Sequence, residues 1–342
     1  MNGAGATSAS AMRAIVIDGR GGVDLVEKAV PAPSEDEVLI SPRAVGVCGT
    51  DLHLIAGTFP LARYPVTPGH EFAGVVTAVG RAVTRVREGD LVCVDPNVSC
   101  GLCSRCRDGV PNHCPQLDPL GLTRDGACAE FVTAPAANVF ALPAGVSPHV
   151  GALIEPLSCV IHAARRTPGW PDARVAVFGA GPIGLLAVAV ALHRGAASVV
   201  AFEPHTGRRA AAVVVGAEEA YAGVAEMDTL FDFDIAIEAS GHTAAIRDAM
   251  GCLGPLGRLV QMGAANPEAR IEVSPHEVFA KELMIIGSFS VADAYAEAVE
   301  TMPDLASSIA SLITERVPLS QYRQGLERLN APTNIKMLVV PD

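Results

Sequence analysis

The sequence predicts an α/β protein in which a doubly wound parallel sheet accompanies a second, mostly β region. Two patterns in the chain indicate this class. After about Pro156, strands alternate with helices at the spacing of parallel βαβ units. Between about Met12 and Phe140, short β runs separated by Gly and Pro favour irregular all-β packing. The length of 342 residues allows two domains, each with a substantial core.

The first region is expected to contain five short strands. They fall at residues 14–18, 38–44, 72–79, 91–95 and 129–134, where apolar and β-branched residues lie between turn formers. The preceding residues, 1–11, are small and polar. Because they contain neither a basic segment nor an apolar one, we interpret them as a frayed tail and not as a secretory signal.

The second region is expected to form the parallel sheet. We predict strands at residues 175–178, 199–203, 235–238, 258–262 and 283–287, with helices over 182–194 and from about Arg208. After about Ser290 the alternation stops. Helices at 292–302 and 320–329 and a final strand at 335–340 are predicted there, and we expect this tail to return to the first region.

Composition and charge argue against several functional classes. The net charge is −12 and the isoelectric point is near 5.2, whereas a nucleic-acid-binding surface needs clustered Lys and Arg. No run of about 18 uninterrupted apolar residues exists, so no transmembrane helix is expected. Nine cysteines without an export signal favour metal ligands or packed thiols in a reducing compartment. We therefore expect a cytoplasmic protein that binds neither nucleic acid nor membranes.

A glycine loop opens the second region. Gly179, Gly181 and Gly184 follow an apolar strand and begin a helical pattern, in the arrangement G-x-G-x-x-G. In this context Gly179 permits the tight turn, Gly181 lets the backbone approach a pyrophosphate, and Gly184 lets helix and strand pack closely. The loop predicts a dinucleotide site in which the phosphates lie at the helix N-terminus.

One acidic residue indicates which dinucleotide binds. Glu203 lies nineteen residues after Gly184, where a carboxylate accepts hydrogen bonds from the adenosine ribose and repels a 2′-phosphate. This pattern favours NAD over NADP. Arg208 and Arg209 support the alternative, since an Arg near this site can pair with a 2′-phosphate.

Four cysteines form a compact cluster in the first region. Cys100, Cys103, Cys106 and Cys114 have the spacing C-x2-C-x2-C-x7-C, which lets four thiolates surround one zinc ion in a closed structural site. The alternatives are an iron–sulfur cluster, whose usual spacings differ, and four unrelated thiols. His113 could replace Cys114 as a ligand, but neighbouring residues rarely reach one ion, so we favour Cys114.

A second set of metal-ligating residue types is dispersed along the chain. It comprises Cys48-Gly-Thr-Asp-Leu-His53, Gly69-His-Glu71 and Glu155-Pro156. Taken singly, Cys48 reads as a small buried residue, His70 as a core histidine and Glu155 as a carboxylate at a helix start. The residues alone favour these structural interpretations.

Taken together, the motifs resemble those of the zinc-dependent medium-chain alcohol and polyol dehydrogenases, nearest to the sorbitol dehydrogenase branch. The resemblance extends from about Met12 to the C-terminus. It rests on the four-cysteine loop and on the segments Cys48-Gly-Thr-Asp-Leu-His53, Pro68-Gly-His-Glu-Phe-Ala-Gly-Val-Val76, Glu155-Pro-Leu-Ser-Cys159 and Gly179-Ala-Gly-Pro-Ile-Gly184.

The resemblance implies a division into two domains. Residues 1–156 and 290–342 correspond to a GroES-like catalytic domain, and residues 157–289 correspond to a Rossmann domain that binds NAD. The active site of such enzymes lies in the cleft between the domains.

The resemblance also implies a second zinc ion, which is catalytic. Cys48, His70 and Glu155 resemble its ligands, and Glu71 resembles a further ligand or a near neighbour. Many relatives have Cys where this chain has Glu155, and a Glu at this position suggests the polyol branch.

Three further residues correspond to positions that move protons or orient ligands. Thr50 resembles the hydroxyl that accepts the substrate proton, and His53 resembles the next member of the relay to solvent. Asp51 resembles an acceptor that orients His70. In the cofactor domain, Ile183, Glu203 and Arg208 resemble residues that touch NAD, and Gly263 and Ser288 lie at strand ends that hold the nicotinamide half.

The implied function is zinc-dependent hydride transfer from a secondary alcohol of a polyol or sugar alcohol to NAD. Butanediol, threonine or an aminocyclitol are alternative substrates, and a regulator that binds zinc and NAD without catalysis is an alternative of another class. Intact Thr50, His53 and Glu155 argue against the regulator. Relatives form homodimers or homotetramers, commonly through the sheet edge near residues 283–290.

Overall fold

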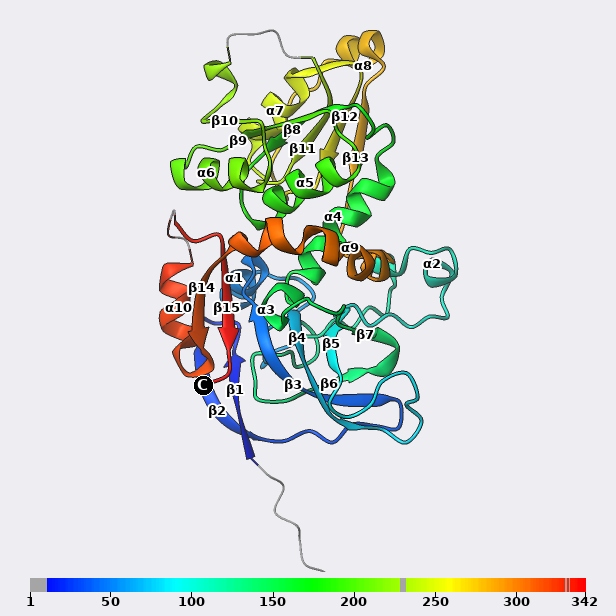
Figure 1. The fold of residues 1–342 in the computed structure, drawn as a ribbon, viewed down its shortest axis with the longest axis vertical. Helices are drawn as coiled ribbons and strands as arrows, with labels where there is room; N and C mark the ends of the chain where they lie inside the picture. Colours follow the sequence, from blue (N-terminus) through cyan, green and yellow to red (C-terminus); the bar gives the residue numbers. More distant parts are fainter. Residues whose placement is uncertain (1–10, 228–231, 330, 332) are drawn as a thin grey trace, which may run out of the picture.

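The computed structural model describes residues 11–227, 232–329, 331 and 333–342. The frayed tail predicted for residues 1–11 therefore lies outside the described residues, except for Ala11, which begins the first strand. The described residues form two large sheets and a two-stranded hairpin, and the helices α4 (Ile154–Arg166) and α9 (Tyr295–Ile309) lie between the large sheets (Figure 1).

A six-stranded sheet forms one half of the molecule, and all its strands are parallel. Its order is β10-β9-β8-β11-β12-β13, so the chain builds outward from β8 in one direction and then from β11 in the other. This is the doubly wound Rossmann arrangement that the sequence predicts. The strands are β8 (Arg174–Phe178), β9 (Ser198–Phe202), β10 (Glu219–Tyr221), β11 (Phe233–Glu238), β12 (Leu253–Gln261) and β13 (Met284–Gly287).

Helices cover both faces of this sheet, because successive side chains of a strand point to opposite sides. On β8, Val175 and Val177 pack in the cluster that contains α5, whereas Ala176 and Phe178 pack in the cluster that contains α7. Burial on both faces explains why these strands read as continuous apolar runs. The helices are α5 (Pro182–His193), α6 (Thr206–Val215), α7 (Thr243–Gly251) and α8 (Pro275–Lys281).

A seven-stranded sheet forms the other half, with the order β14-β15-β3-β4-β5-β7 and β6 paired to β3. Its pairs are antiparallel except for β14 and β15. Its members are β3 (Glu37–Gly46), β4 (Glu71–Val79), β5 (Leu91–Val94), β6 (Val132–Pro135), β7 (Val139–Ala141), β14 (Ile313–Pro318) and β15 (Lys336–Val340), and a hairpin of β1 (Ala11–Ile17) and β2 (Val23–Ala29) lies beside it. This is the mostly β, GroES-like part, and the predicted return of the tail is confirmed by the pairing of β15 with β3.

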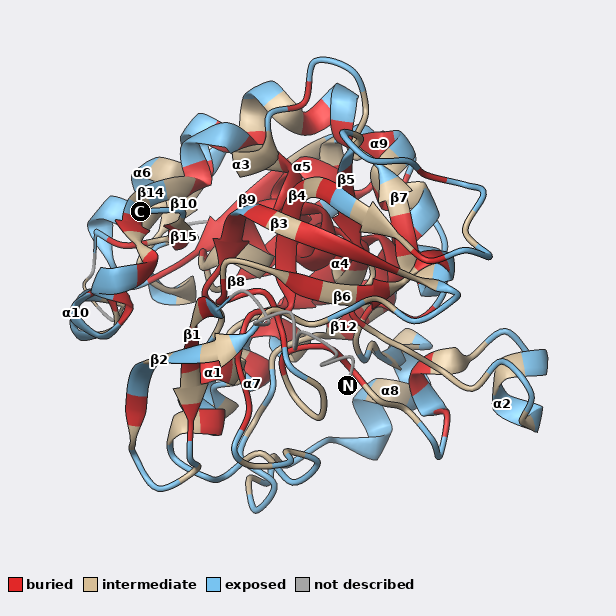
Figure 2. Cartoon of the chain, turned by 90° about the horizontal axis from the view of Figure 1, so that it is seen from below, coloured by how far each residue is buried: buried red, intermediate tan, exposed pale blue. Residues whose placement is uncertain are grey.

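Short helices connect the strands of this half. They are α1 (Gly49–Ile55), α2 (Ser104–Arg107), α3 (Pro148–Gly151) and α10 (Tyr322–Arg328), with 3-10 turns at Pro111–His113, Ala136–Asn138, Val224–Glu226, Ala310–Leu312 and Leu319–Gln321 along the chain. Buried residues concentrate in the strands and in the helices that face them (Figure 2).

Several elements differ from the sequence-based expectation. Strands β2 and β14 were not predicted, because charged residues interrupt both. Helix α4 was not predicted either; its Pro156 lies in the first turn, where a helix tolerates Pro. The boundary that we place after residue 156, which stays a prediction, lies within this helix. Helix α9 begins at Tyr295 and not at Ala292, since Ala292 has a left-handed backbone with φ of 51°.

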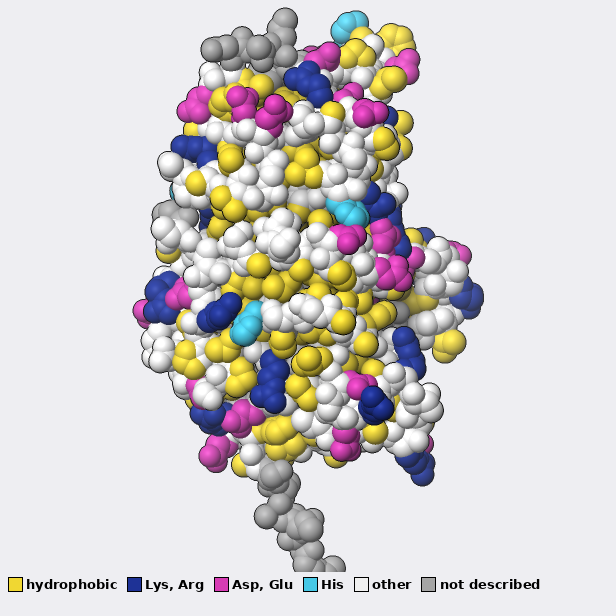
Figure 3. All heavy atoms as spheres, viewed as in Figure 1, with side chains coloured by type: hydrophobic (Ala, Val, Ile, Leu, Met, Phe, Trp, Pro, Cys, Tyr) yellow, Lys and Arg dark blue, Asp and Glu magenta, His cyan; other side chains and the backbone are white. Residues whose placement is uncertain are grey.

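The surface carries charges of both signs. On the face shown in Figure 3, Lys and Arg side chains are scattered among Asp and Glu. Within the described part of the chain, no helix has the length and apolarity needed to cross a membrane.

Candidate active site and metal centres

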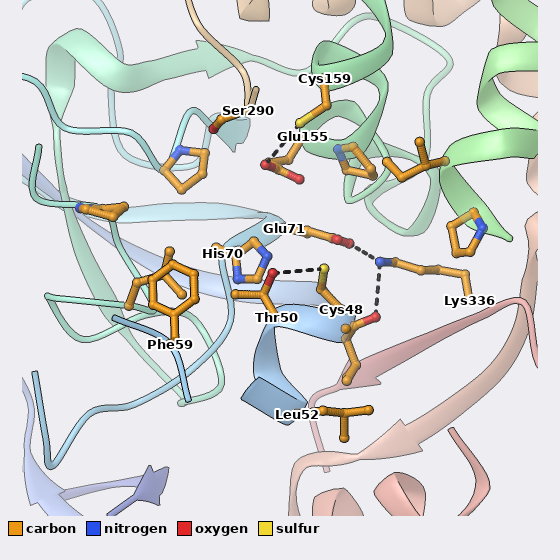
Figure 4. A pocket seen from close by; sticks show the side chains of 18 of the residues that line it. Cys48, Thr50, Leu52, Phe59, His70, Glu71, Glu155, Cys159, Ser290 and Lys336 are labelled. Carbon is orange, nitrogen blue, oxygen red and sulfur yellow. Dashed lines mark hydrogen bonds and ion pairs between the residues drawn. The ribbon is translucent and has the colours of Figure 1, made fainter. Parts of the chain in front are cut away.

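A cavity of about 420 Å³ lies between the two halves of the molecule. Residues of α1, the start of β4, the first turn of α4 and the start of β15 line it, together with Phe289 and Ser290 from the connection after β13. Figure 4 shows polar side chains from these separate elements turned toward one another. The cavity therefore collects residues that are far apart in the sequence.

Three of the expected ligands of the catalytic metal meet in this cavity. The ligand atoms of Cys48, His70 and Glu71 all lie within 4.8 Å of one another. Cys48 immediately precedes α1, and Glu71 begins β4. The residue before His70 has to be glycine. Gly69 has a φ of 100°, and a Cβ on it would lie only 2.8 Å from the backbone nitrogen of Cys128. A thiol, an imidazole and a carboxylate form a donor set that suits zinc.

Glu155, the fourth expected ligand, faces this group from α4 without belonging to the 4.8 Å cluster. Its carboxylate points toward His70 and Cys48 (Figure 4), and the Cys159 thiol lies 3.8 Å from Oε1. Burial, and next the charge of Glu71, raise the pKa of the Glu155 carboxyl to about 7. A divalent cation at this position would stabilise the ionised forms of the Glu155 carboxyl and the Cys48 thiol.

A lysine that the sequence analysis missed pairs with Glu71. Lys336, at the start of β15, is only 2% exposed in its side chain, and its ammonium forms an ion pair with Glu71 Oε2. It also donates a hydrogen bond to the carbonyl of Val47 at 3.1 Å. Burial lowers the pKa of Lys336, but the charges of Glu71 and Cys48 outweigh it, so the pKa is raised. A lysine within an otherwise apolar strand is the sequence signal that could have found this residue.

Asp51 lies beside Cys48 and His70 and is completely buried. Its Oδ2 accepts a hydrogen bond from the backbone N–H of Cys48 at 2.9 Å, and its Oδ1 lies 3.9 Å from Nδ1 of His70. Burial lowers the pKa of His70, but its hydrogen bond with Cys48 and the Asp51 charge outweigh this and raise the pKa to about 10. Asp51 is thus near enough to act on His70 electrostatically, although this distance exceeds that of a hydrogen bond.

Thr50 and His53 lie three residues apart on α1 and differ in exposure. Thr50 lines the cavity, with Oγ1 3.6 Å from the sulfur of Cys48. His53 is exposed, and its Nδ1 lies 3.1 Å from the hydroxyl of Thr58.

The four-cysteine loop forms a second, separate group. The ligand atoms of Cys100, Cys103, Cys106 and Cys114 lie within 4.8 Å of one another, with neighbouring sulfurs 3.5 to 3.9 Å apart. Hydrogen bonds from the backbone N–H groups of Leu102 and Cys103 lower the pKa of Cys100 to about 6, which favours the thiolate that zinc binds. His113 does not belong to this group; its ring instead contacts that of Phe289, with centroids 5.9 Å apart.

The glycine loop has the geometry that its three positions require. Gly179 has a φ of 92°, and a Cβ on Gly184 would lie 1.8 Å from the carbonyl oxygen of Gly179. A Cβ on Gly181 would meet no atom within 4 Å, so the space beside this residue is open. A second cavity of about 420 Å³ begins there and extends along Glu203 and Arg208 at the carboxyl ends of the strands, where doubly wound sheets bind nucleotides.

The predicted cofactor residues are spread over both cavities. Glu203 lies just after β9, where its carboxylate accepts hydrogen bonds from Ala180 N at 2.9 Å and His205 N at 3.0 Å. Arg208 lines both cavities and Ile183 lines the first. Gly263 and Ser288 follow β12 and β13, and the buried hydroxyl of Ser288 has no hydrogen-bond partner among the described residues.

The comparisons with known proteins agree with this geometry. Residues 34–144 match the alcohol dehydrogenase GroES-like domain, and residues 148–340 match the glucose dehydrogenase C-terminus. The chain is 33% identical to D-altritol 5-dehydrogenase of Agrobacterium fabrum, over 91% of this chain and 94% of that protein. It belongs to the zinc-dependent medium-chain alcohol and polyol dehydrogenases.

Further relatives of this dehydrogenase differ in substrate and cofactor. Sorbitol dehydrogenase of Bacillus subtilis is 32% identical over 97% of this chain and 98% of that protein. L-threonine 3-dehydrogenase of Saccharopolyspora erythraea is also 32% identical, over 91% of this chain and 93% of that protein. A zinc-binding dehydrogenase structure from Sinorhizobium meliloti 1021 with NADP superposes with a TM-score of 0.91, at 31% identity over 97% of this chain and all of that one. The structure of an alcohol dehydrogenase from Escherichia coli CFT073 with NADH superposes with a TM-score of 0.87. It is 29% identical, over 97% of this chain and 99% of that one.

The predicted cofactor set is therefore supported as a whole. The dehydrogenase has a structural site of four cysteines, a catalytic site of Cys, His and Glu, and a Rossmann site for NAD(P).

Breaking the buried ion pair between Lys336 and Glu71 should lower the stability of the protein. Lys336→Met leaves a buried, unpaired carboxylate, and we expect the free energy of unfolding to fall by about 3–5 kcal/mol. Adding Glu71→Gln to Lys336→Met removes both charges and should recover most of this loss. Urea unfolding of the wild type, the single variant and the double variant measures the effect. A single variant as stable as the wild type would show that the two charges are not buried together.

The four-cysteine group should hold its own zinc ion. We expect Cys103→Ser to lower the zinc content from about two ions per chain to about one and to lower Tm, because a closed zinc site is coupled to the folding of its loop. Elemental analysis and thermal unfolding measure both quantities. Ser104→Ala, an exposed neighbour, is the matched control. Full zinc content and Tm in Cys103→Ser, or iron in the wild type, would contradict the assignment.

Proposed function

We propose that the dehydrogenase oxidises a secondary alcohol of a polyol or sugar alcohol, with NAD as the hydride acceptor. The observation that carries this proposal is the convergence of Cys48, His70, Glu155 and Thr50 on one cavity that the cofactor domain also lines. The presence of Glu155, where many relatives have Cys, and the similarity to altritol and sorbitol dehydrogenases favour a polyol.

The chain's own residues have distinct roles in this proposal. Cys48, His70 and Glu155 hold the zinc ion, while Lys336 holds the Glu71 carboxylate beside them. Bound zinc supplies Lewis acidity, which lowers the pKa of an alcohol hydroxyl. Thr50 accepts the substrate proton at its Oγ1.

The proton then has to leave the cavity. Among the described residues no hydrogen bond joins Thr50 to His53. The relay therefore needs the ribose of the cofactor between Thr50 and His53, as the family resemblance implies. His53 is exposed and can pass the proton to solvent.

The preference for NAD rests on the surroundings of Glu203. This carboxylate is only 4% exposed, and two backbone N–H groups stabilise its charge beside the second cavity. Both competing arginines donate to backbone carbonyls, whereas Nε of Arg208 has no hydrogen-bond partner among the described residues. Arg209 donates to the carbonyls of Glu203 and Pro204 at 2.8 and 2.7 Å, and Arg208 donates to the carbonyl of Asn334 at 3.2 Å. A 2′-phosphate placed beside Glu203 would therefore meet an anionic carboxylate.

Replacing Glu203 tests this preference. Glu203→Gln keeps the side chain's shape but removes its charge, and we expect the ratio of kcat/KM for NAD over NADP to fall at least about tenfold, since hydrogen bonds to charged groups are worth about 1.5–3 kcal/mol. Glu203→Ala should lower the ratio further. Steady-state kinetics with both cofactors measure it. A wild type that prefers NADP would overturn the assignment and make Arg208 the dominant contact.

Substrate class is tested by formation of NADH in a panel of alcohols. We expect faster turnover with sorbitol and D-altritol than with butane-2,3-diol, L-threonine or an aminocyclitol. Thr50→Ala should reduce kcat by about 10²–10⁴-fold, because it removes the group that accepts the proton, and should keep its zinc. Thr77→Ala, on the exposed side of β4, is the control. Faster turnover of L-threonine would favour that substrate, and no turnover of any alcohol would favour the regulator.

We also propose that the protein is a cytoplasmic homodimer or homotetramer. Strand β13 is the edge of the six-stranded sheet, and the side chains of Met284, Ile285 and Phe279 beside it are exposed by 49, 55 and 80%. Pairing of this edge with that of a second copy would cover these apolar groups. All nine cysteines are free thiols, as a reducing compartment favours. Sedimentation analysis tests the assembly, and a monomer would contradict it.

A further inference from the structure

The connection between β13 and α9 has an unusual backbone. Ser290 and Ala292 have φ values of 61° and 51°, in the left-handed region that residues with a Cβ seldom adopt. Such conformations cost free energy and persist only where the surroundings hold them. This connection, residues 288–292, leads from the cofactor sheet toward the other half of the molecule.

Two asparagines from the other half hold the connection. The side-chain amide of Asn112 donates to the carbonyl of Phe289 at 2.9 Å, and that of Asn97 donates to the hydroxyl of Ser290 at 2.9 Å. Asn97 follows β5, and Asn112 belongs to the 3-10 turn Pro111–His113 of the four-cysteine loop. The bond to Phe289 therefore crosses from the half that contains the metal groups to the last residue of the cofactor half, and the bond to Ser290 holds the next residue, where the chain returns.

Asn112 is well fixed for this contact. It is 4% exposed and lies two residues before Cys114, so its position follows that of the four-cysteine group. Its Oδ1 has no hydrogen-bond partner among the described residues, and its side-chain amide donates to the carbonyl of Phe289. The ring of the next residue, His113, contacts the ring of Phe289. The four-cysteine loop thus contacts both the backbone carbonyl and the ring of Phe289.

The held connection forms a wall of the active-site cavity. Phe289 and Ser290 line the same cavity as Cys48, Thr50 and Glu155, and Figure 4 shows Ser290 across the cavity from His70. Ser288, whose buried hydroxyl lacks a partner among the described residues, directly precedes Phe289. The nicotinamide half of the cofactor is expected at this strand end. The two asparagines therefore fix the carbonyl of Phe289 and the hydroxyl of Ser290 beside the expected position of the nicotinamide.

We propose that Asn112, assisted by Asn97, is a positioning residue for the nicotinamide half of the cofactor. The four-cysteine loop then has a role beyond stability, because it sets the shape of the cofactor wall from the opposite half of the molecule. This inference rests on the proposed binding of the nicotinamide at Ser288. Its physical basis is preorganisation: a wall already held in its strained conformation needs no ordering when the cofactor binds.

The test compares two ligands that share the adenosine diphosphate part of the cofactor. NADH contains the nicotinamide and ADP-ribose does not. With Asn112→Ala we expect Kd for NADH to rise about fivefold, the effect of one net hydrogen bond, and Kd for ADP-ribose to stay unchanged. Asn97→Ala should act in the same direction. Gln116→Ala, exposed on the same loop, is the matched control and should change neither Kd.

Fluorescence of bound NADH and calorimetry with ADP-ribose give the two constants for the zinc-loaded protein. Zinc content measured on each variant shows whether the four-cysteine group is intact. Unchanged Kd for NADH in both asparagine variants, or equal increases for NADH and ADP-ribose with full zinc content, would overturn the inference. If Asn112→Ala loses zinc, Asn97→Ala alone decides. Failure of the wild type to bind NADH more tightly than ADP-ribose would instead contradict the proposed nicotinamide site.

Discussion

Charge burial at one cavity is the constraint on which the rest of this structure depends. Cys48, His70, Glu71 and Glu155 face one another where little solvent can stabilise their charges, so each charge needs a partner. Lys336 neutralises Glu71, and the remaining donors suit a divalent cation. Because Lys336 begins β15, the sheet must accept the final strand next to β3, far from its neighbours in sequence. The position of β15 in the sheet therefore also determines whether Glu71 has a charged partner in the site.

In the cofactor half, backbone N–H groups instead of a metal ion stabilise the buried carboxylates. Glu238 is fully buried at the end of β11, and its carboxylate accepts hydrogen bonds from the N–H groups of Ser240 and Gly241 and from the side chain of Gln261. Glu203 is satisfied in the same manner one strand away from the glycine loop. These bonds fix the loops at the carboxyl ends of the strands. The nucleotide cavity is thereby formed by the protein alone, before a ligand enters.

The features that sequence could predict are those whose cause is local. Glycines at fixed offsets after a strand, closely spaced cysteines and apolar runs each identify their structure without knowledge of distant residues, and the parallel sheet, the dinucleotide loop and the four-cysteine group followed from them. The converging ligands needed the family resemblance, since Cys48, His70 and Glu155 are separated in the chain. Lys336 and Asn112 were missed, because each acts through a partner more than a hundred residues away. Helix α4 was missed because Pro156 resembles a boundary in sequence and is tolerated in structure.

The late position of β15 in the chain has a consequence for biosynthesis. The ribosome makes β15 after every other described strand, so a nascent chain contains Glu71 long before it contains Lys336. The strands of the six-stranded sheet are all complete by residue 287 and can pair while the tail is still being made. A product that ends before residue 313 would lack β14, β15 and the lysine that pairs with Glu71. Completion of the active site thus depends on synthesis of β15.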